Sequence, residues 1–125
     1  MTTIVLVSHS ADIAKGTKDL LEQMVNNVDI KAHGGTEDGS IGTSFDEIQK
    51  MINHIEDDAL CFYDLGSSEM NLDMAIEMYE GQYEIVKINA PLVEGSFTAA
   101  VKLSTGGNMK EAIEEVNNTH FSSET

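Results

Sequence analysis

The chain has 125 residues, 41% of them hydrophobic, which predicts one globular domain over residues 1–125 with a core of its own. Its 22 acidic residues face seven lysines and no arginine, and the net charge of −15 argues against nucleic acid or an anionic membrane as partner and favours partners with basic patches. No apolar run is long enough to cross a membrane, and the amino terminus lacks the pattern of a secretory signal, so we expect a cytoplasmic protein.

The first predicted element is a buried strand, formed by the apolar run Ile4–Val7. Ser8-His9-Ser10 follows directly, so His9 is expected where this strand ends and the loop to the next helix begins. In open α/β sheets, ligands bind at that edge. Imidazole titrates near neutrality and has a nucleophilic nitrogen, which suggests proton or phosphoryl transfer. From its position alone, His9 could also be an ordinary polar loop residue.

A helix is predicted next, because apolar residues recur at helical spacing. We expect its inward-facing stripe to consist of Ile13, Thr17, Leu20, Met24 and Val28, widened by Leu21 and Val25. The alternation over residues 28–32 indicates a weak second strand. The loop from His33 to Gly42 contains four of the ten glycines, and His33 is expected there as a solvated residue.

Ser44 and Glu47 have the spacing of a capping box, which predicts a second helix along Phe45, Ile48, Ile52 and Ile55. Residues 59–63 form a third strand that contains Cys61, the single cysteine. One thiol cannot form an internal disulfide, in keeping with a reducing compartment, and we expect Cys61 to be a small buried residue.

Asp64–Ser68 is the next loop, with Ser68 as the predicted N-cap of a third helix. A fourth strand is expected at Ile85–Ile88. Two more helices follow from apolar spacing, one along Phe97 and Ala100 and one over Met109–Val116, and the polar tail 117–125 is expected to be disordered.

Strands alternating with helices predict an α/β fold, a small doubly wound and mostly parallel sheet of four or five strands in the order 2-1-3-4 with helices on both faces. Right-handed crossovers bring all strand-to-helix loops to one edge of the sheet. His9 and Asp64 should then flank the point where the winding reverses.

A carboxylate at that point can accept a hydrogen bond from one nitrogen of His9 and leave the other nitrogen as the nucleophile. Gly66 permits close approach of the backbone, and the following helix would present free N–H groups to an anion. Because the chain lacks arginine, backbone amides, hydroxyls or lysine would have to hold any phosphate. The histidines and Cys61 lack metal-ligand spacing, so we expect no metal.

Four segments in order, Val5–Ser10, Gly39–Ser44, Asp64–Ser68 and Ala90–Gly95, resemble the phosphotransfer subunit of the phosphoenolpyruvate-dependent dihydroxyacetone kinase. That subunit belongs to the mannose-type IIA components of the bacterial sugar phosphotransferase system. The resemblance runs from about Thr2 to Val116 and implies that a histidine accepts a phosphoryl group, originally from phosphoenolpyruvate, from the phosphocarrier HPr. The group then passes to ADP on the nucleotide-binding subunit of the kinase, with no bound cofactor.

Carried over by position, the resemblance makes His9 the phosphorylated histidine and Asp64 the residue that orients it. Thr43, Ser44, Gly66, Ser67 and Ser68 would flank the phosphate. The resemblance also implies a homodimer and a single-domain form that takes its phosphoryl group from a separate donor.

Two interpretations stay open. The apolar residues Leu65, Met70 and Phe97 could form a docking rim for the partners or belong to the core. The alternative function is a regulatory IIA-like domain, phosphorylated on the same histidine, that signals to a transcription factor or another sugar-transport component.

Overall fold

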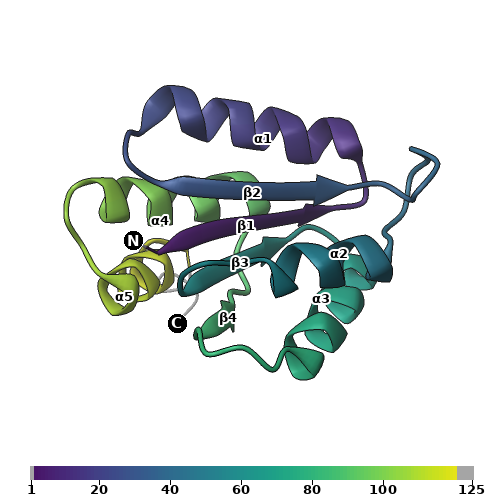
Figure 1. The fold of residues 1–125 in the computed structure, drawn as a ribbon. Helices are drawn as coiled ribbons and strands as arrows, with labels where there is room; N and C mark the ends of the chain where they lie inside the picture. The colour runs from purple at the N-terminus through teal and green to yellow at the C-terminus, as the bar shows by residue number, and fades with distance from the viewer. Residues whose placement is uncertain (1, 121–125) are drawn as a thin grey trace.

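The computed structural model describes residues 2–120, in which strands and helices alternate along the chain (Figure 1). The elements are β1 (Thr3–Ser8), α1 (Ala11–Met24), β2 (Asp29–Gly34), α2 (Phe45–Asn53), β3 (Ala59–Tyr63), α3 (Gly66–Met78), β4 (Ile85–Lys87), α4 (Leu92–Ser104) and α5 (Met109–His120).

The four strands form one parallel sheet in the order β2-β1-β3-β4, which confirms the predicted fold class and strand order. β1 lies in the middle, and all six of its residues are buried, as its apolar composition requires. β1 and β3 are neighbours, so the loops that follow them leave the same edge of the sheet side by side.

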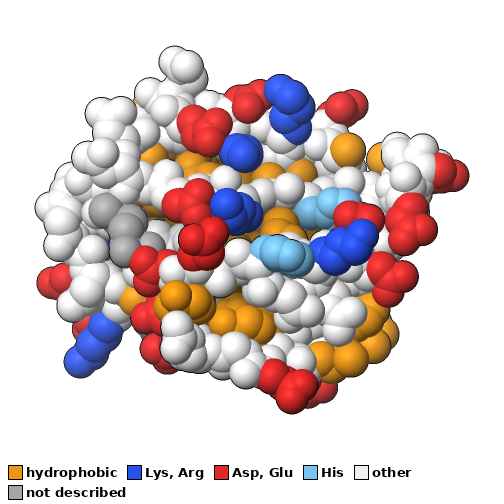
Figure 2. Space-filling model, viewed as in Figure 1, with side chains coloured by type: hydrophobic (Ala, Val, Ile, Leu, Met, Phe, Trp, Pro, Cys, Tyr) orange, Lys and Arg blue, Asp and Glu red, His pale blue; other side chains and the backbone are white. Residues whose placement is uncertain are grey.

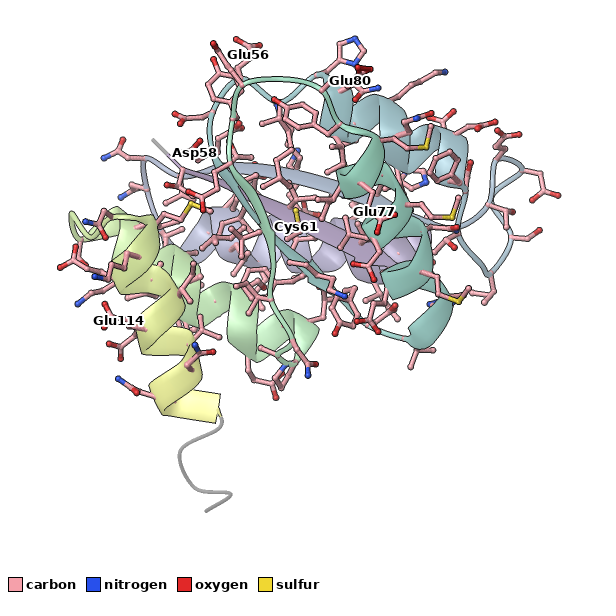
Figure 3. All side chains as sticks on the ribbon, turned by 90° about the horizontal axis from the view of Figure 1, so that it is seen from below. Glu56, Asp58, Cys61, Glu77, Glu80 and Glu114 are labelled. Atoms are coloured by element: carbon pink, nitrogen blue, oxygen red, sulfur yellow. The ribbon has the colours of Figure 1, made fainter. Side chains whose placement is uncertain are left out.

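Alternate residues of the central strands face two separate hydrophobic clusters. Ile4 and Leu6 pack with residues of α1, α4 and α5, whereas Val5 and Val7 pack with residues of α2 and α3. Figure 1 shows this arrangement, with the sheet between the two groups of helices. Cys61 is fully buried in the second cluster, as predicted (Figure 3).

The buried face of α1 differs from the predicted stripe. Ile13, Leu20 and Met24 are 49%, 45% and 59% exposed. The helix buries Ala14, Thr17 and Leu21, of which Thr17 and Leu21 belong to the predicted stripe and Ala14 does not. Both sets have helical spacing, and the smaller side chains Ala14 and Thr17 let α1 lie close to the sheet. The prediction was therefore right about the helix and about Thr17 and Leu21, and wrong about Ile13, Leu20 and Met24.

Two boundaries also differ from expectation. β2 runs to Gly34, so His33 belongs to a strand and not to a solvated loop. Helix α5 continues to His120, so the predicted disordered tail is corrected over residues 117–120, while residues 121–125 lie outside the described part of the chain. Among residues 2–120, no helix combines the length and apolar character needed to cross a bilayer.

Candidate active site

His9 and Asp64 meet at the edge of the sheet where β1 and β3 end. The His9 Nδ1 atom lies 2.9 Å from Asp64 Oδ1, and the two side chains are 16% and 19% exposed. The pairing of β1 with β3 brings these residues together although 55 positions separate them in the sequence. The structure thus places side by side the two residues that the sequence singled out.

The Asp64 carboxylate is held by hydrogen bonds to both of its oxygens. Oδ2 accepts from the Ser8 hydroxyl at 2.6 Å and from the His9 amide at 3.1 Å. Oδ1 accepts from the Leu65 amide at 2.7 Å and the Ser68 hydroxyl at 2.9 Å. Burial alone would raise the pKa of Asp64, but these bonds, led by those from Ser8 and His9, together outweigh burial and lower the pKa well below its ordinary value.

The ionised Asp64 carboxylate determines which nitrogen of His9 carries the proton. A carboxylate can only accept hydrogen bonds, so the Nδ1 atom that faces it must be protonated. In the neutral ring the lone pair is then on Nε2, which contacts the Ser67 hydroxyl at the start of α3. The pair therefore presents one defined nucleophilic atom at the edge of the sheet.

Gly66, Ser67 and Ser68 form the first turn of α3, and their positions correct the predicted start of this helix. The N-cap is Leu65, and Ser68 lies inside the helix. Ser68 is fully buried, and its hydroxyl contacts Asp64 Oδ1 and the Leu65 carbonyl oxygen. Ser68 thus supports Asp64, and Ser67 is the serine that reaches His9.

Thr43 and Ser44 lie beside the site at the end of the 36–42 loop, which is tied to His9 by a 2.8 Å hydrogen bond from the Gly42 amide to the His9 carbonyl. Ser44 is 9% exposed and is the N-cap of α2, where its hydroxyl accepts from the Glu47 amide at 3.3 Å; this is the Ser44 half of the predicted capping box. Thr43 accepts a 2.7 Å hydrogen bond from the Asn71 side chain, so its own hydroxyl hydrogen can still be donated.

Sequence reasoning missed two residues of this site. Ser8 is fully buried, and its hydroxyl donates to Asp64 and accepts from the Ser10 amide at 3.0 Å. Asn71 of α3 holds Thr43. The sequence did offer a signal for Ser8, because it is a polar residue directly after the apolar run Ile4–Val7. It offered no signal for Asn71, which is one of several polar residues on α3.

The other described histidines have different surroundings. His33 is half-buried on the edge strand β2, with its Nε2 atom buried and without a hydrogen-bond partner, and His54 contacts the Lys50 carbonyl oxygen at the end of α2. The side chain of His120 lies outside the described part of the chain. Within residues 2–120, no group of three or more His, Cys, Asp and Glu side chains is arranged to hold a metal ion.

Comparison with known proteins places the chain in a family. Residues 3–117 match the family model described as the PTS system fructose IIA component, EIIA-man. A phosphotransferase subunit DhaM of the PTS-dependent dihydroxyacetone kinase from Lactococcus lactis is 46% identical over 90% of this chain and 89% of its own length. A phosphoryl donor subunit DhaM of dihydroxyacetone kinase 1 from Listeria innocua is 44% identical over 80% of each chain.

Solved structures share the fold of this chain. The crystal structure of the protein EF1359, of unknown function, has a TM-score of 0.85 at 36% identity and covers 94% of this chain and 93% of its own. The EIIA component from Streptococcus agalactiae shares the fold, with a TM-score of 0.71 at 15% identity over 95% and 92% of the two chains. The chain belongs to the mannose-type IIA family of the phosphotransferase system and resembles within it the DhaM phosphoryl donor subunits of dihydroxyacetone kinases.

Proposed function

We propose that this chain is the phosphoryl relay of a phosphoenolpyruvate-dependent dihydroxyacetone kinase. It accepts a phosphoryl group on His9 from the phosphocarrier HPr and passes it to ADP on the nucleotide-binding subunit, whose ATP then phosphorylates dihydroxyacetone. The named function of relatives that are 44–46% identical supports this assignment. The chain would act as a phosphotransferase component in the cytoplasm, as a homodimer and without a bound cofactor.

The observation that carries the proposal is the His9–Asp64 pair. Asp64 holds the Nδ1 hydrogen, so the Nε2 lone pair attacks the phosphorus of the donor phosphohistidine in line. The bond from phosphorus to the donor nitrogen breaks as the bond to Nε2 forms. The ring becomes positively charged during this step, and the ionised Asp64 stabilises that charge.

The groups around Nε2 can hold a phosphoryl group without arginine. The Ser67 hydroxyl contacts Nε2, and the first amides of α3 at Gly66 and Ser67 belong to a helix N-terminus, where anions are favoured. Thr43 can donate its hydroxyl hydrogen from the neighbouring loop. Ser44 and Ser68 take supporting roles instead, because the first caps α2 and the second is buried against Asp64.

Exposed apolar side chains near the site are suited to docking the proteins that donate and accept the phosphoryl group. Leu65 and Met70 are 63% and 67% exposed at the start of α3, and Ile41 is 76% exposed in the 36–42 loop. Partners that bury such residues exclude water from the transferring group. The third residue expected in this rim, Phe97, packs against the core instead and is not included.

An intact-mass assay tests the relay. The chain is incubated with phosphoenolpyruvate, enzyme I and HPr, and then with the ADP-bearing subunit, alongside a His9→Ala variant and a reaction without HPr. We expect an acid-labile phosphate adduct that needs both HPr and His9 and that the ADP-bearing subunit removes. Phosphate on the His9→Ala variant would refute the assignment of His9.

The same assay separates the relay from a regulatory function. A regulatory IIA-like domain would gain the same adduct from HPr, but the ADP-bearing subunit would leave the adduct in place. Persistence of the adduct would therefore contradict the relay and favour signalling to a transcription factor or another transport component.

A further inference from the structure

Lys87, the last residue of β4, is bound between two carboxylates of α3. Its Nζ atom lies 2.6 Å from Glu69 Oε2 and 2.9 and 3.0 Å from the two oxygens of Asp73. The Lys87 side chain is 24% exposed, whereas the other ion-paired lysines of the described residues, Lys15, Lys31 and Lys50, are 76%, 45% and 71% exposed. Lys87 is thus the most shielded of these cations.

Further contacts fix the Lys87 ammonium group in place. It lies 5.6 Å from the centre of the Tyr63 ring, within the range of a cation–π interaction. Tyr63 in turn donates a 3.1 Å hydrogen bond to the Asn89 side chain. The hydrogen bond to Glu69, followed by that to Asp73, raises the pKa of Lys87 to about 12, so the group stays charged at neutral pH.

The two carboxylates are on the helix that begins at the active site. Glu69 lies two residues after Ser67, whose hydroxyl contacts His9 Nε2, and Asp73 lies one turn further along α3. A phosphoryl group on His9 brings up to two further negative charges to this end of the helix. Glu69 and Asp73 would repel it, in a chain that already carries a net charge of −15.

We propose that Lys87 masks the charges of Glu69 and Asp73 and so allows His9 to take up a phosphoryl group. This role rests on the proposed function of His9. Lys87 does not contact the reacting atoms. It acts through Glu69 and Asp73, whose negative charge it partly neutralises. In a site without arginine, the cation that offsets the local negative charge comes from the neighbouring strand.

The test uses phosphoramidate, a small-molecule donor that phosphorylates histidine with release of ammonia and needs no partner protein. The full chain and a Lys87→Met variant are compared by intact mass at low and high salt. Lys15→Met is the matched control, because it removes the same charge and breaks an ion pair, Lys15–Asp19, on the surface of α1. We expect phosphorylation of Lys87→Met to be about fivefold slower at low salt and the defect to shrink at high salt, with Lys15→Met unchanged.

A triple variant distinguishes an electrostatic role of Lys87 from a purely structural one. Lys87→Met combined with Glu69→Gln and Asp73→Asn removes all three charges, and we expect it to recover the original rate. Lys15→Met with Asp19→Asn and Glu22→Gln is its control, because it changes the net charge equally. A triple variant that stays slow, or a defect that salt does not change, would show that Lys87 only holds α3 in place and would overturn the proposal.

The double variant Glu69→Gln with Asp73→Asn keeps the proposal testable should Lys87→Met fail to fold. It leaves Lys87 charged beside neutral partners, so phosphorylation should be at least as fast as in the original chain, and slower phosphorylation would contradict charge masking. Because phosphoramidate replaces HPr throughout, failure of HPr to phosphorylate the original chain would refute the proposed function without affecting this comparison.

Discussion

The two nitrogens of the His9 ring have different surroundings. Nδ1 faces a carboxylate whose oxygens accept hydrogen bonds from two serine hydroxyls and two backbone amides, whereas Nε2 faces Ser67 at the surface of the site. A network in which every member has a partner keeps its geometry, because any movement leaves a buried polar group unpaired. The nucleophile is therefore held in one orientation before a partner arrives.

Ser8 supports this orientation from inside the protein, and Ser8→Ala tests its role. The variant loses the 2.6 Å hydrogen bond to Asp64, which should cost about 1–2 kcal/mol in the free energy of unfolding and slow phosphorylation of His9. Ser10→Ala is the matched control, since it removes the N-cap of α1 at a cost of about 1 kcal/mol without touching Asp64. Urea unfolding and intact mass measure both effects. Equal rates in the two variants would remove Ser8 from the site.

The lowered pKa of Asp64 predicts how stability depends on pH. A carboxyl group whose pKa is lower in the folded state stabilises the fold fully above its ordinary value of 3.8, and this contribution is lost as the pH falls through the lowered pKa. Asp64→Asn lacks this titration. We expect its deficit in unfolding free energy to be largest at neutral pH and to shrink in acid below 3.8. A deficit that does not change with pH would contradict the ionised pair.

At the scale of elements, short connections hold the site together. Only His9 and Ser10 separate β1 from α1, and Asp64 and Leu65 separate β3 from α3, so the ends of two strands and the starts of two helices converge. β2 approaches the first connection at Gly34. A Cβ atom added there would lie 2.3 Å from the Ser10 carbonyl oxygen and 3.0 Å from the Ala14 Cβ.

Gly34→Ala should therefore push the Ser10 backbone away from β2. We expect a loss of about 2–3 kcal/mol in unfolding free energy, together with slower phosphorylation of His9. Gly16→Ala is the counterpart within α1, where a Cβ atom meets nothing within 4 Å, and it should stabilise the protein by about 0.5–1 kcal/mol. Thermal unfolding compares the two variants, and a Gly34→Ala protein as stable as the original would refute the close packing.

At the scale of the whole molecule, charge governs how the site meets its partners. Acidic side chains are spread over the face in Figure 2, with the lysines and histidines set among them. A net charge of −15 attracts donors with basic patches and makes association depend on salt. We therefore expect phosphorylation by HPr to slow as salt rises, measured as the initial rate of adduct formation. The rate with phosphoramidate should change much less, and an equal response of both donors would contradict electrostatic steering.

The sequence predicts the order of the strands and helices better than it predicts the contacts of individual side chains. The apolar run Ile4–Val7 and the alternation of strands with helices led to the strand order, and that order brought His9 to Asp64. The inner face of α1 was predicted only in part, because neighbouring residues share helical spacing, and contact with the sheet selects Ala14 over Ile13 and Leu21 over Leu20. Ser8 and Ser68 both hydrogen-bond Asp64, and these roles depend on where Asp64 lies in space, which the local sequence does not encode.

The most direct test of the proposed mechanism is to identify the ring nitrogen of His9 that carries the phosphoryl group. NMR spectra of the chain with nitrogen-15 in its histidine rings, phosphorylated through HPr, distinguish the two positions. Because Asp64 holds the Nδ1 hydrogen, we expect phosphate on Nε2. Phosphate on Nδ1 would mean that the pair with Asp64 breaks during transfer and would contradict the mechanism.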